Sequence, residues 1–321
     1  MCLKMSRVLI GVIVLLVLGS YAVNSVELTE TTIYVDDGNT DGPWDGSAAH
    51  PFQYIQDGID AAEKGDTVHV LNGMYHEHLF VDKSINLIGE HNTKTVINSI
   101  SENDIIQIVD TKNVLIRGFL IQNEIPFEAY LAGISIINTS QTEISENIIL
   151  GCYDGILLKS TDCMVSNNTI VSNKLGISFG HYRSGHSSET NEWYNTQNVF
   201  SPLYSHTGNV ITSNHLKNNS DAGIDLSYTT ENSISRNEFS INWIGIRLRE
   251  SNQNEITENN FYDNSINTLD MADNQWNASY YDDWIGLKLS LFSFFPYVIP
   301  GTLLANLDAD PASEPYDIGG E

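Results

Sequence analysis

The stretch "MYHEH" carries the side chains in this sequence that are best suited to bind a soft metal ion. Met74, His76 and His78 alternate with other residues, so on a β-strand they would all point to one face. A thioether and two imidazoles are ligands that copper accepts. The alternative is an exposed strand face with incidental histidines. The sequence requires no cofactor; copper at these residues, or calcium beside an acidic substrate, are the metals to consider.

A second pair of residues, Asp225 and Arg247, combines a carboxylate with a guanidinium group. Each is the third residue of a "G-I-x-L" motif, which starts at Gly223 and again at Gly245. On neighbouring strands the two side chains would point the same way, about 5 Å apart. A basic residue beside a carboxylate could remove a proton in a polysaccharide lyase. The alternative is a surface ion pair, which stabilises a fold only slightly.

Residues 181–207 interrupt an otherwise regular pattern and concentrate aromatic and polar side chains. The candidate ligand contacts in this insertion are His181, Trp193, Tyr194 and Tyr204. Aromatic faces with hydrogen-bonding neighbours suit sugar rings, and loops on a rigid scaffold are where binding sites are often built. The alternatives are a lid that packs its aromatic residues on the scaffold, and a degenerate coil.

A repeat of about 22 residues positions these candidates. Its clearest mark is the asparagine that ends "ISEN", "VSNN", "ITSN", "ISRN" and "ITEN". Short apolar runs are separated by Asn and Gly, which both tolerate left-handed backbone at turns. The pattern predicts an all-β fold, a single right-handed parallel β-helix of about eight coils with stacked asparagines. The predicted column contains Asn147, Asn168, Asn214, Asn237 and Asn259.

We expect the β-helix to span residues 66–276, with a cap at each end. Residues 26–65 include "PFQYIQDGIDAAEKG", in which apolar residues from Phe52 onward have helical spacing; such a helix would close one end of the stack. Residues 277–321 include the apolar run "WIGLKLSLFSFFPYVIPGTLL", Trp284–Leu304, whose prolines and lysine argue against a membrane span. We interpret it as a hydrophobic cap on the last coil. Cys152 and Cys163 fall in different columns, so we expect no bond between them.

The N-terminus and the charge predict a protein outside the cytoplasm. Lys4 and Arg7 precede a short apolar run, Val8–Gly19, so residues 1–25 are typical of a secretory signal. The alternative is an uncleaved anchor, and we expect no other stable membrane span. The net charge of −26 argues against nucleic acid as a partner. The expected location is secreted or extracytoplasmic, including the cell surface.

Three parts of the sequence carry a resemblance to known proteins. The segment from "IYVDDGN" to "SINLIGE", residues 33–90, resembles the N-terminal part of secreted right-handed β-helix proteins. The copies between residues 113 and 264 resemble NosD-type repeats of the pectin-lyase-like superfamily, in the group of carbohydrate-binding proteins and sugar hydrolases. The close, with "NQWNASYYDDW", is similar to endings of archaeal surface proteins of this kind. The resemblance implies the β-helix fold, and it implies copper delivery, polysaccharide cleavage or non-catalytic binding as functions.

The motifs of the polygalacturonases in that superfamily are incomplete in this sequence. Gly180–His181 continues into Tyr182 instead of glycine, and "RLR", Arg247–Arg249, lacks the lysine. We therefore expect a binding or structural module for extracellular polysaccharide or a cell-envelope component. The alternatives are a polysaccharide lyase or glycoside hydrolase, and a NosD-like periplasmic copper-binding protein.

Overall fold

The structure, a computed structural model, describes the chain in segments. These are residues 30–99, 103–124, 131–179, 185–187, 192–194, 206–283, 297–299, 306–308 and 310–319. The predicted signal segment, residues 1–25, lies outside the described residues. Among the residues that are described, no helix is long and apolar enough to cross a membrane.

Short parallel strands in three sheets make up most of the described regular structure. In spatial order, the ten-stranded sheet contains β1 (Thr32–Val35), β2 (Thr67–Val70), β5 (Asn86–Gly89), β8 (Leu115–Arg117), β11 (Glu143–Ser145), β14 (Met164–Ser166), β19 (Val210–Thr212), β22 (Ser233–Ser235), β25 (Glu255–Thr257) and β28 (Gln275–Asn277). The nine-stranded sheet contains β3 (Gly73–Tyr75), β6 (Thr95–Ser99), β9 (Leu120–Asn123), β12 (Ile148–Leu150), β15 (Thr169–Val171), β20 (His215–Lys217), β23 (Glu238–Ser240), β26 (Asn260–Tyr262) and β29 (Tyr280–Tyr281). The eight-stranded sheet contains β4 (Leu79–Val81), β7 (Ile106–Val109), β10 (Ala132–Ser140), β13 (Asp154–Thr161), β16 (Leu175–Phe179), β21 (Ala222–Ser227), β24 (Ile244–Arg249) and β27 (Ile266–Asp270).

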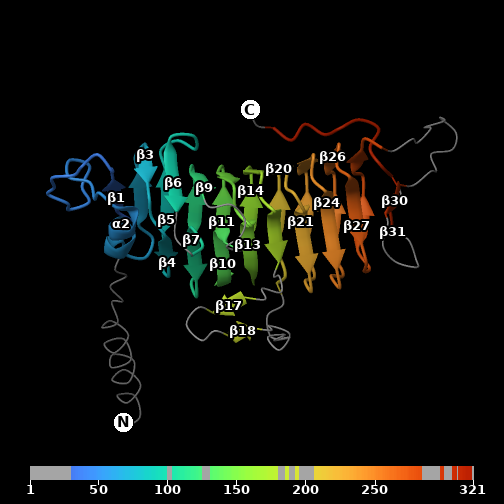
Figure 1. Cartoon of the computed structure of the whole chain (residues 1–321), viewed down its shortest axis with the longest axis horizontal. Helices are drawn as coiled ribbons and strands as arrows, with labels where there is room; N and C mark the ends of the chain where they lie inside the picture. The colour runs from blue at the N-terminus through green and yellow to red at the C-terminus, as the bar shows by residue number, and fades with distance from the viewer. Residues whose placement is uncertain are drawn as a thin grey trace, which may run out of the picture. The chain divides into compact units, whose positions relative to one another are not determined.

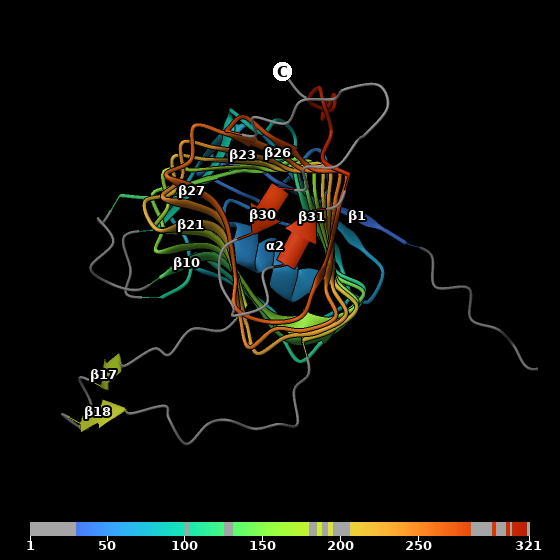
Figure 2. The ribbon, with the colours of Figure 1, turned by 90° about the vertical axis from the view of Figure 1, so that its right-hand side faces the viewer.

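The chain visits the three sheets in turn, so its strands stack coil upon coil (Figure 1), and Figure 2 looks along the stack. Equivalent residues pair in register: Ile144 pairs with Val165, which pairs with Ile211. All three are fully buried, because alternate residues of each strand point into the interior. The interior is an apolar core along the stack. The predicted all-β fold, a right-handed parallel β-helix, is confirmed.

The predicted asparagine ladder lies at the turns between the ten-stranded and nine-stranded sheets. The Nδ2 of each asparagine donates to the Oδ1 of the next one, at 3.0–3.1 Å. The backbone N–H of the same residue donates to that Oδ1 at 2.9–3.0 Å. Because these amides are buried, the bonds replace those that water would make. The structure confirms the column of Asn147, Asn168, Asn214, Asn237 and Asn259.

Two further columns follow the other two corners of the coils, and each includes one of the buried cysteines. The backbone N–H of Cys152 donates to Asn173 Oδ1 at 2.9 Å, and that of Cys163 to Asn209 Oδ1 at 3.0 Å. Both thiols are free, so the expectation that they do not pair is confirmed. Burial raises the pKa of both thiols, which keeps them protonated and makes them poor metal ligands.

Helix α2 (Ile55–Ala61) lies across the N-terminal end of the stack (Figure 2). Its buried residue Ile55 joins the core. The backbone N–H of Ile55 donates to Oε1 of Glu77 at 2.7 Å, so a residue from the first coil caps the helix. The expected N-terminal helical cap is present, but it starts at Ile55. Phe52, where we expected the apolar helical face to begin, instead forms a parallel bridge with Val35.

An antiparallel pair, β30 (Tyr297–Ile299) and β31 (Asn306–Asp308), lies at the opposite end of the stack (Figure 1). The buried carboxylate of Asp308 accepts the backbone N–H groups of Ser279 at 2.9 Å and Ala278 at 3.1 Å. Ser279 is the rung after Asn259, whose N–H donates to the serine hydroxyl at 3.4 Å. Asp308 therefore ends the ladder. Most of the predicted hydrophobic cap, residues 284–304, lies outside the described residues.

The tail that follows runs back over the outer face of the nine-stranded sheet (Figure 1). The side chain of Asn260 donates to the carbonyl oxygen of Tyr316 at 2.7 Å and accepts its N–H at 2.9 Å. Farther along, Nε2 of His215 lies 2.8 Å from the carbonyl oxygen of Gly319. The tail thus contacts coils from which it is 56 and 104 residues away in the sequence.

Candidate functional site

The eight-stranded sheet places Asp225 and Arg247 side by side on its outer face. Asp225 in β21 is the register partner of Arg247 in β24, and Arg247 Nε donates to Asp225 Oδ2 at 3.0 Å. The flanking residues Ile224 and Leu226 belong to the core, so the alternation of the strand turns Asp225 outward. The predicted proximity of Asp225 and Arg247 is confirmed. Their catalytic role stays a prediction.

Arg247 is the centre of a larger ion network. Its Nη1 donates to Asp221 Oδ1 at 2.7 Å, and Arg249 Nη2 donates to Asp225 Oδ2 at 2.7 Å. Burial of Arg247 opposes its charge, but hydrogen bonds to Asp221 and Asp225 outweigh that effect and raise its pKa. Asp225 is fully buried, and a buried carboxylate requires such partners. An oxygen shared by two guanidinium groups is held in place, which suits stabilisation of the sheet better than proton transfer.

Beside this network, the residues that come just before successive strands of the eight-stranded sheet form a row. Its members directly precede β13, β16, β21 and β24, and they are Tyr153, Lys174, Asp221 and Trp243. The Lys174 Nζ lies 4.6 Å from the centroid of the Tyr153 ring. The Trp243 side chain is 57% exposed. The row therefore has an aromatic group at each end and two charged groups between them, with neighbours about 5 Å apart.

Ile241 lies at the turn just before Trp243, and its backbone conformation is unfavourable for its residue type. Its φ of 59° is in the left-handed region, where a β-branched residue is an outlier. Its side chain is also 49% exposed. The same turn position in the other coils, also with positive φ, holds Gly151, Ser172, Asn218 and Asp263. An exposed apolar residue in a strained conformation lowers stability, and such residues are concentrated at functional sites.

We expect Ile241→Asn to raise the free energy of unfolding by about 1 kcal/mol, because asparagine tolerates the left-handed conformation that isoleucine does not. Urea unfolding would measure the change. The matched control is Val210→Asn, at an exposed β-branched residue in a strand, where no such gain is expected. A loss of stability in Ile241→Asn would show that the isoleucine contributes to the fold.

The sequence did not single out Ile241 and Trp243 because only the residue between them, Asn242, belongs to the repeated asparagine pattern. A signal was present in the aligned copies. Small or polar residues occupy the position of Ile241 in the other coils, so the isoleucine breaks the pattern of the turn. Two residues later, Trp243 stands where the adjacent coils have Asp221 and Ser265.

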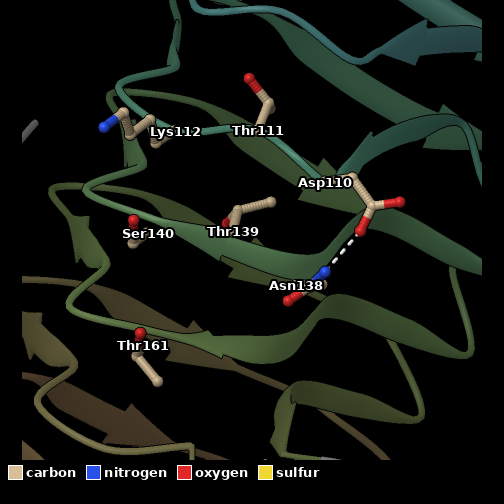
Figure 3. A pocket seen from close by; sticks show the side chains of 7 residues that line it. All are labelled: Asp110, Thr111, Lys112, Asn138, Thr139, Ser140 and Thr161. Atoms are coloured by element: carbon tan, nitrogen blue, oxygen red, sulfur yellow. Dashed lines mark hydrogen bonds between the residues drawn. The ribbon is translucent and has the colours of Figure 1, made fainter.

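A polar hollow of about 510 Å³ opens at the other ends of the strands, beside β7, β10 and β13 (Figure 3). It is open to solvent. The residues that line it are Asp110, Thr111, Lys112, Asn138, Thr139, Ser140 and Thr161.

Met74, His76 and His78 do not share one strand, so the expectation that they form a single strand face is wrong. Strand β3 ends at Tyr75, which leaves His76 and His78 in the connection to β4. The chain leaves the sheet there to place Glu77 over helix α2. The Nδ1 of His78 contacts a backbone carbonyl oxygen. Among the described residues, no three His, Cys, Asp or Glu side chains form a group that could hold a metal ion.

The insertion at residues 181–207 is described only in part. Strands β17 (Gly185–Ser187) and β18 (Glu192–Tyr194) pair antiparallel, with Trp193 opposite His186. His181 and Tyr204 lie outside the described residues. Ligand binding by His181, Trp193, Tyr194 and Tyr204 stays a prediction.

Several solved structures share the β-helix fold. Pectate lyase Pel9A is 14% identical, with a TM-score of 0.54, over 75% of this chain and 71% of that one. The GH136 lacto-N-biosidase from Eubacterium ramulus is 14% identical, with a TM-score of 0.51, over 78% and 54%. The Dettilon tailspike protein is 16% identical, with a TM-score of 0.51, over 78% and 55%. This chain thus spans about half the length of the last two, and the likeness shows the fold alone.

No curated protein matches the sequence. The family model described as periplasmic copper-binding protein (NosD) matches residues 59–184 and 161–283, which together cover more than half of the chain. These matches include the asparagine ladder and the row that ends at Trp243. The chain belongs to the NosD family.

Proposed function

We propose that this protein binds neutral extracellular carbohydrate, without cleaving it, at the turn around Trp243. The observation that carries the proposal is the exposed pair Ile241 and Trp243 among polar residues of the adjacent coils. An indole offers a flat apolar face to the C–H side of a sugar ring. Asp221 and Ser265, at the equivalent positions on either side, can bond to sugar hydroxyls.

Charge supports a neutral ligand. The chain has 41 acidic and 15 basic residues, so an acidic polysaccharide would be repelled over most of its surface. At the turn itself, the carboxylate of Asp221 is paired with Arg247, which compensates its charge. A location outside the cytoplasm agrees with the description of the family as periplasmic.

The ion network supports binding rather than cleavage. Glycoside hydrolysis commonly needs two carboxyl groups that flank the scissile bond, one of them a proton donor. Asp221 and Asp225, in the strand next to that of Trp243 and just before it, both accept hydrogen bonds from Arg247. A group bound in this way is not positioned to exchange a proton with a substrate. The pectate lyase with the same fold is named for cleavage, but its likeness to this chain extends to the fold alone.

Copper binding, which the family description names, does not fit the donors in the described segments. Copper sites use thiolates, thioethers and imidazoles that converge on one point. The thiols of Cys152 and Cys163 are buried in two different ladder columns. Met74 lies in β3, whereas His76 and His78 follow it. We therefore derive no copper-dependent step from these residues.

The test is to measure carbohydrate affinity after Trp243→Ala. A glycan array on the wild-type protein first identifies a neutral polysaccharide, and calorimetric titration then gives the dissociation constant. We expect the variant to bind at least about tenfold more weakly, the effect of losing a central aromatic contact, because the indole stacks on the sugar. Its melting temperature should change little, since the side chain is mostly exposed.

The matched control is Tyr54→Ala, which removes another exposed aromatic side chain, next to helix α2. It should leave the affinity unchanged. Equal affinities of the wild type and Trp243→Ala would exclude this turn as the binding site.

A further inference from the structure

The polar hollow beside β7, β10 and β13 results from a difference in coil length. The register between β10 and β13 shifts after Ile137, so that Ile137 pairs with Lys159 but Ser140 pairs with Thr161. The coil of β13 is therefore one residue shorter at this corner than the coil of β10. In the preceding coil, which contains β7, the same corner keeps the longer spacing, since Lys112 forms a bridge with Ser140 of β10. The shorter coil leaves space under the longer ones.

The side chains around this space are a balanced set of donors and acceptors (Figure 3). The amide of Asn138 donates to Asp110 Oδ1 at 2.5 Å, which fixes the carboxylate at the rim. Lys112, two residues after Asp110, supplies an exposed ammonium group. Hydroxyl groups of Ser140 and Thr161, together with that of Thr111, can each donate and accept.

This chemistry decides which ligand fits. A free anion would meet the carboxylate of Asp110, and a divalent cation would meet the ammonium group of Lys112. A purely apolar ligand would leave the hydroxyl groups without partners. A neutral ring with several hydroxyl groups satisfies all of them, because a carboxylate accepts from sugar hydroxyls while an ammonium group donates to them. The volume lies in the range of small-molecule sites.

We propose that the hollow binds a single neutral sugar residue, such as the end or a branch of a polysaccharide. The ligand class rests on the proposed function, but the site does not share a residue with the turn around Trp243. The two sites lie at opposite ends of the strands of one sheet. The turn presents the exposed aromatic face of Trp243, which suits the face of a sugar ring. The hollow is lined by hydroxyl, amide and charged side chains without an aromatic residue, which suits the hydroxyl edge of a sugar ring.

The test uses methyl glycosides of the common neutral hexoses as probes, with saturation-transfer NMR to measure binding to the full chain. The variants are Asp110→Asn and Lys112→Met. Asn has nearly the shape of Asp and tolerates the φ of 52° at this position, so the backbone should be kept. Loss of a charged hydrogen bond should weaken binding about tenfold or more. The matched control is Glu250→Gln, at an exposed acidic residue with φ of 48° that accepts the Tyr228 hydroxyl at 3.3 Å.

The expected result is that one or more methyl glycosides bind the wild type, Glu250→Gln and Trp243→Ala, but bind Asp110→Asn and Lys112→Met much more weakly. Absence of binding to the wild type, or equal binding by all variants, would overturn the proposal for the hollow. In that case a loss of polysaccharide affinity in Trp243→Ala would still support the proposed function, so the two ideas can fail separately. A glycoside signal that is lost only in Trp243→Ala would also overturn the proposal, because it would place the monosaccharide at the turn.

Discussion

We expect Asn237→Ala to lower the free energy of unfolding by about 3 kcal/mol, because it removes a rung from the middle of the buried ladder. The Oδ1 of Asn237 accepts both the N–H and the Nδ2 of Asn214, each at 3.0 Å. Its own Nδ2 donates to Asn259 Oδ1 at 3.1 Å and to the Ile211 carbonyl oxygen at 2.9 Å. Alanine leaves the buried N–H of Asn214 without its acceptor, and an unsatisfied buried group costs about 1–3 kcal/mol. The other lost bonds add less, because Asn214 Nδ2 still donates to the Val165 carbonyl oxygen and Asn259 Oδ1 still accepts the backbone N–H of residue 237. Urea unfolding followed by far-ultraviolet circular dichroism would measure the loss.

The matched control for the ladder is Asn277→Ala. Asn277 is exposed at the end of β28 and is not a rung, so its replacement should change stability by less than about 0.5 kcal/mol. Carbohydrate binding by Asn237→Ala, measured under conditions in which it is folded, should equal that of the wild type. An unchanged unfolding midpoint with lost binding would mean that the asparagines act on ligand and not on the fold.

Arg247→Met should also lower the free energy of unfolding by about 3 kcal/mol, because it leaves Asp225 buried with fewer partners. The Arg247 side chain is only 12% exposed, and Asp225 is inaccessible to solvent. Arg249 still donates to Asp225 Oδ2, which keeps the expected loss at the lower end of the usual range for a broken buried pair. Urea unfolding is again the measurement.

Two further variants separate the ion network from a general effect of losing arginine. Arg236→Met breaks the exposed pair with Glu258, at 2.7 Å, and should cost less than about 1 kcal/mol. The double variant Asp225→Asn with Arg247→Met should be more stable than Arg247→Met alone, since the buried charge is gone. If Arg247→Met is as stable as the wild type, the network is not structural, and a role for Asp225 in chemistry gains support.

The sequence was sufficient to predict the coils and the ladder because both are local and repeated. Each copy carries the same apolar alternation and the same asparagine, so one pattern is read several times and errors in single copies cancel. In a parallel stack, equal spacing in the sequence becomes vertical alignment, which is why the column from Asn147 to Asn259 followed directly from counting.

The features at the ends of the stack depend on contacts that spacing does not contain. Helix α2 starts at Ile55 because Glu77, 22 residues later, accepts its N–H. The same residue explains why the stretch with Met74 and His78 is not one strand. Asp308 ends a ladder whose preceding rung, Ser279, is 29 residues away. Such single long-range partners leave no periodic signal.

The candidate sites were harder to predict for a different reason. The sequence placed Asp225 beside Arg247 correctly, but it could not show that Asp221 and Arg249 complete a buried network. The hollow depends on one missing residue in the coil of β13, which appears in the sequence only as a step of 21 between Asn147 and Asn168. A coil that is one residue shorter can lose that residue at any of its three corners. The spacing of the asparagines alone therefore does not show which corner is shorter.

Affinity chromatography on the immobilised full chain tests the central claim most directly. A neutral polysaccharide that the wild type recognises on the glycan array is passed over the column, eluted, and its chain length is measured. We predict that the polysaccharide is retained and then recovered at its original length, because Trp243 supplies a binding face while Asp221 and Asp225 are held by Arg247. Recovery of shortened chains would contradict non-catalytic binding, and passage of every neutral polysaccharide without retention would contradict carbohydrate binding itself.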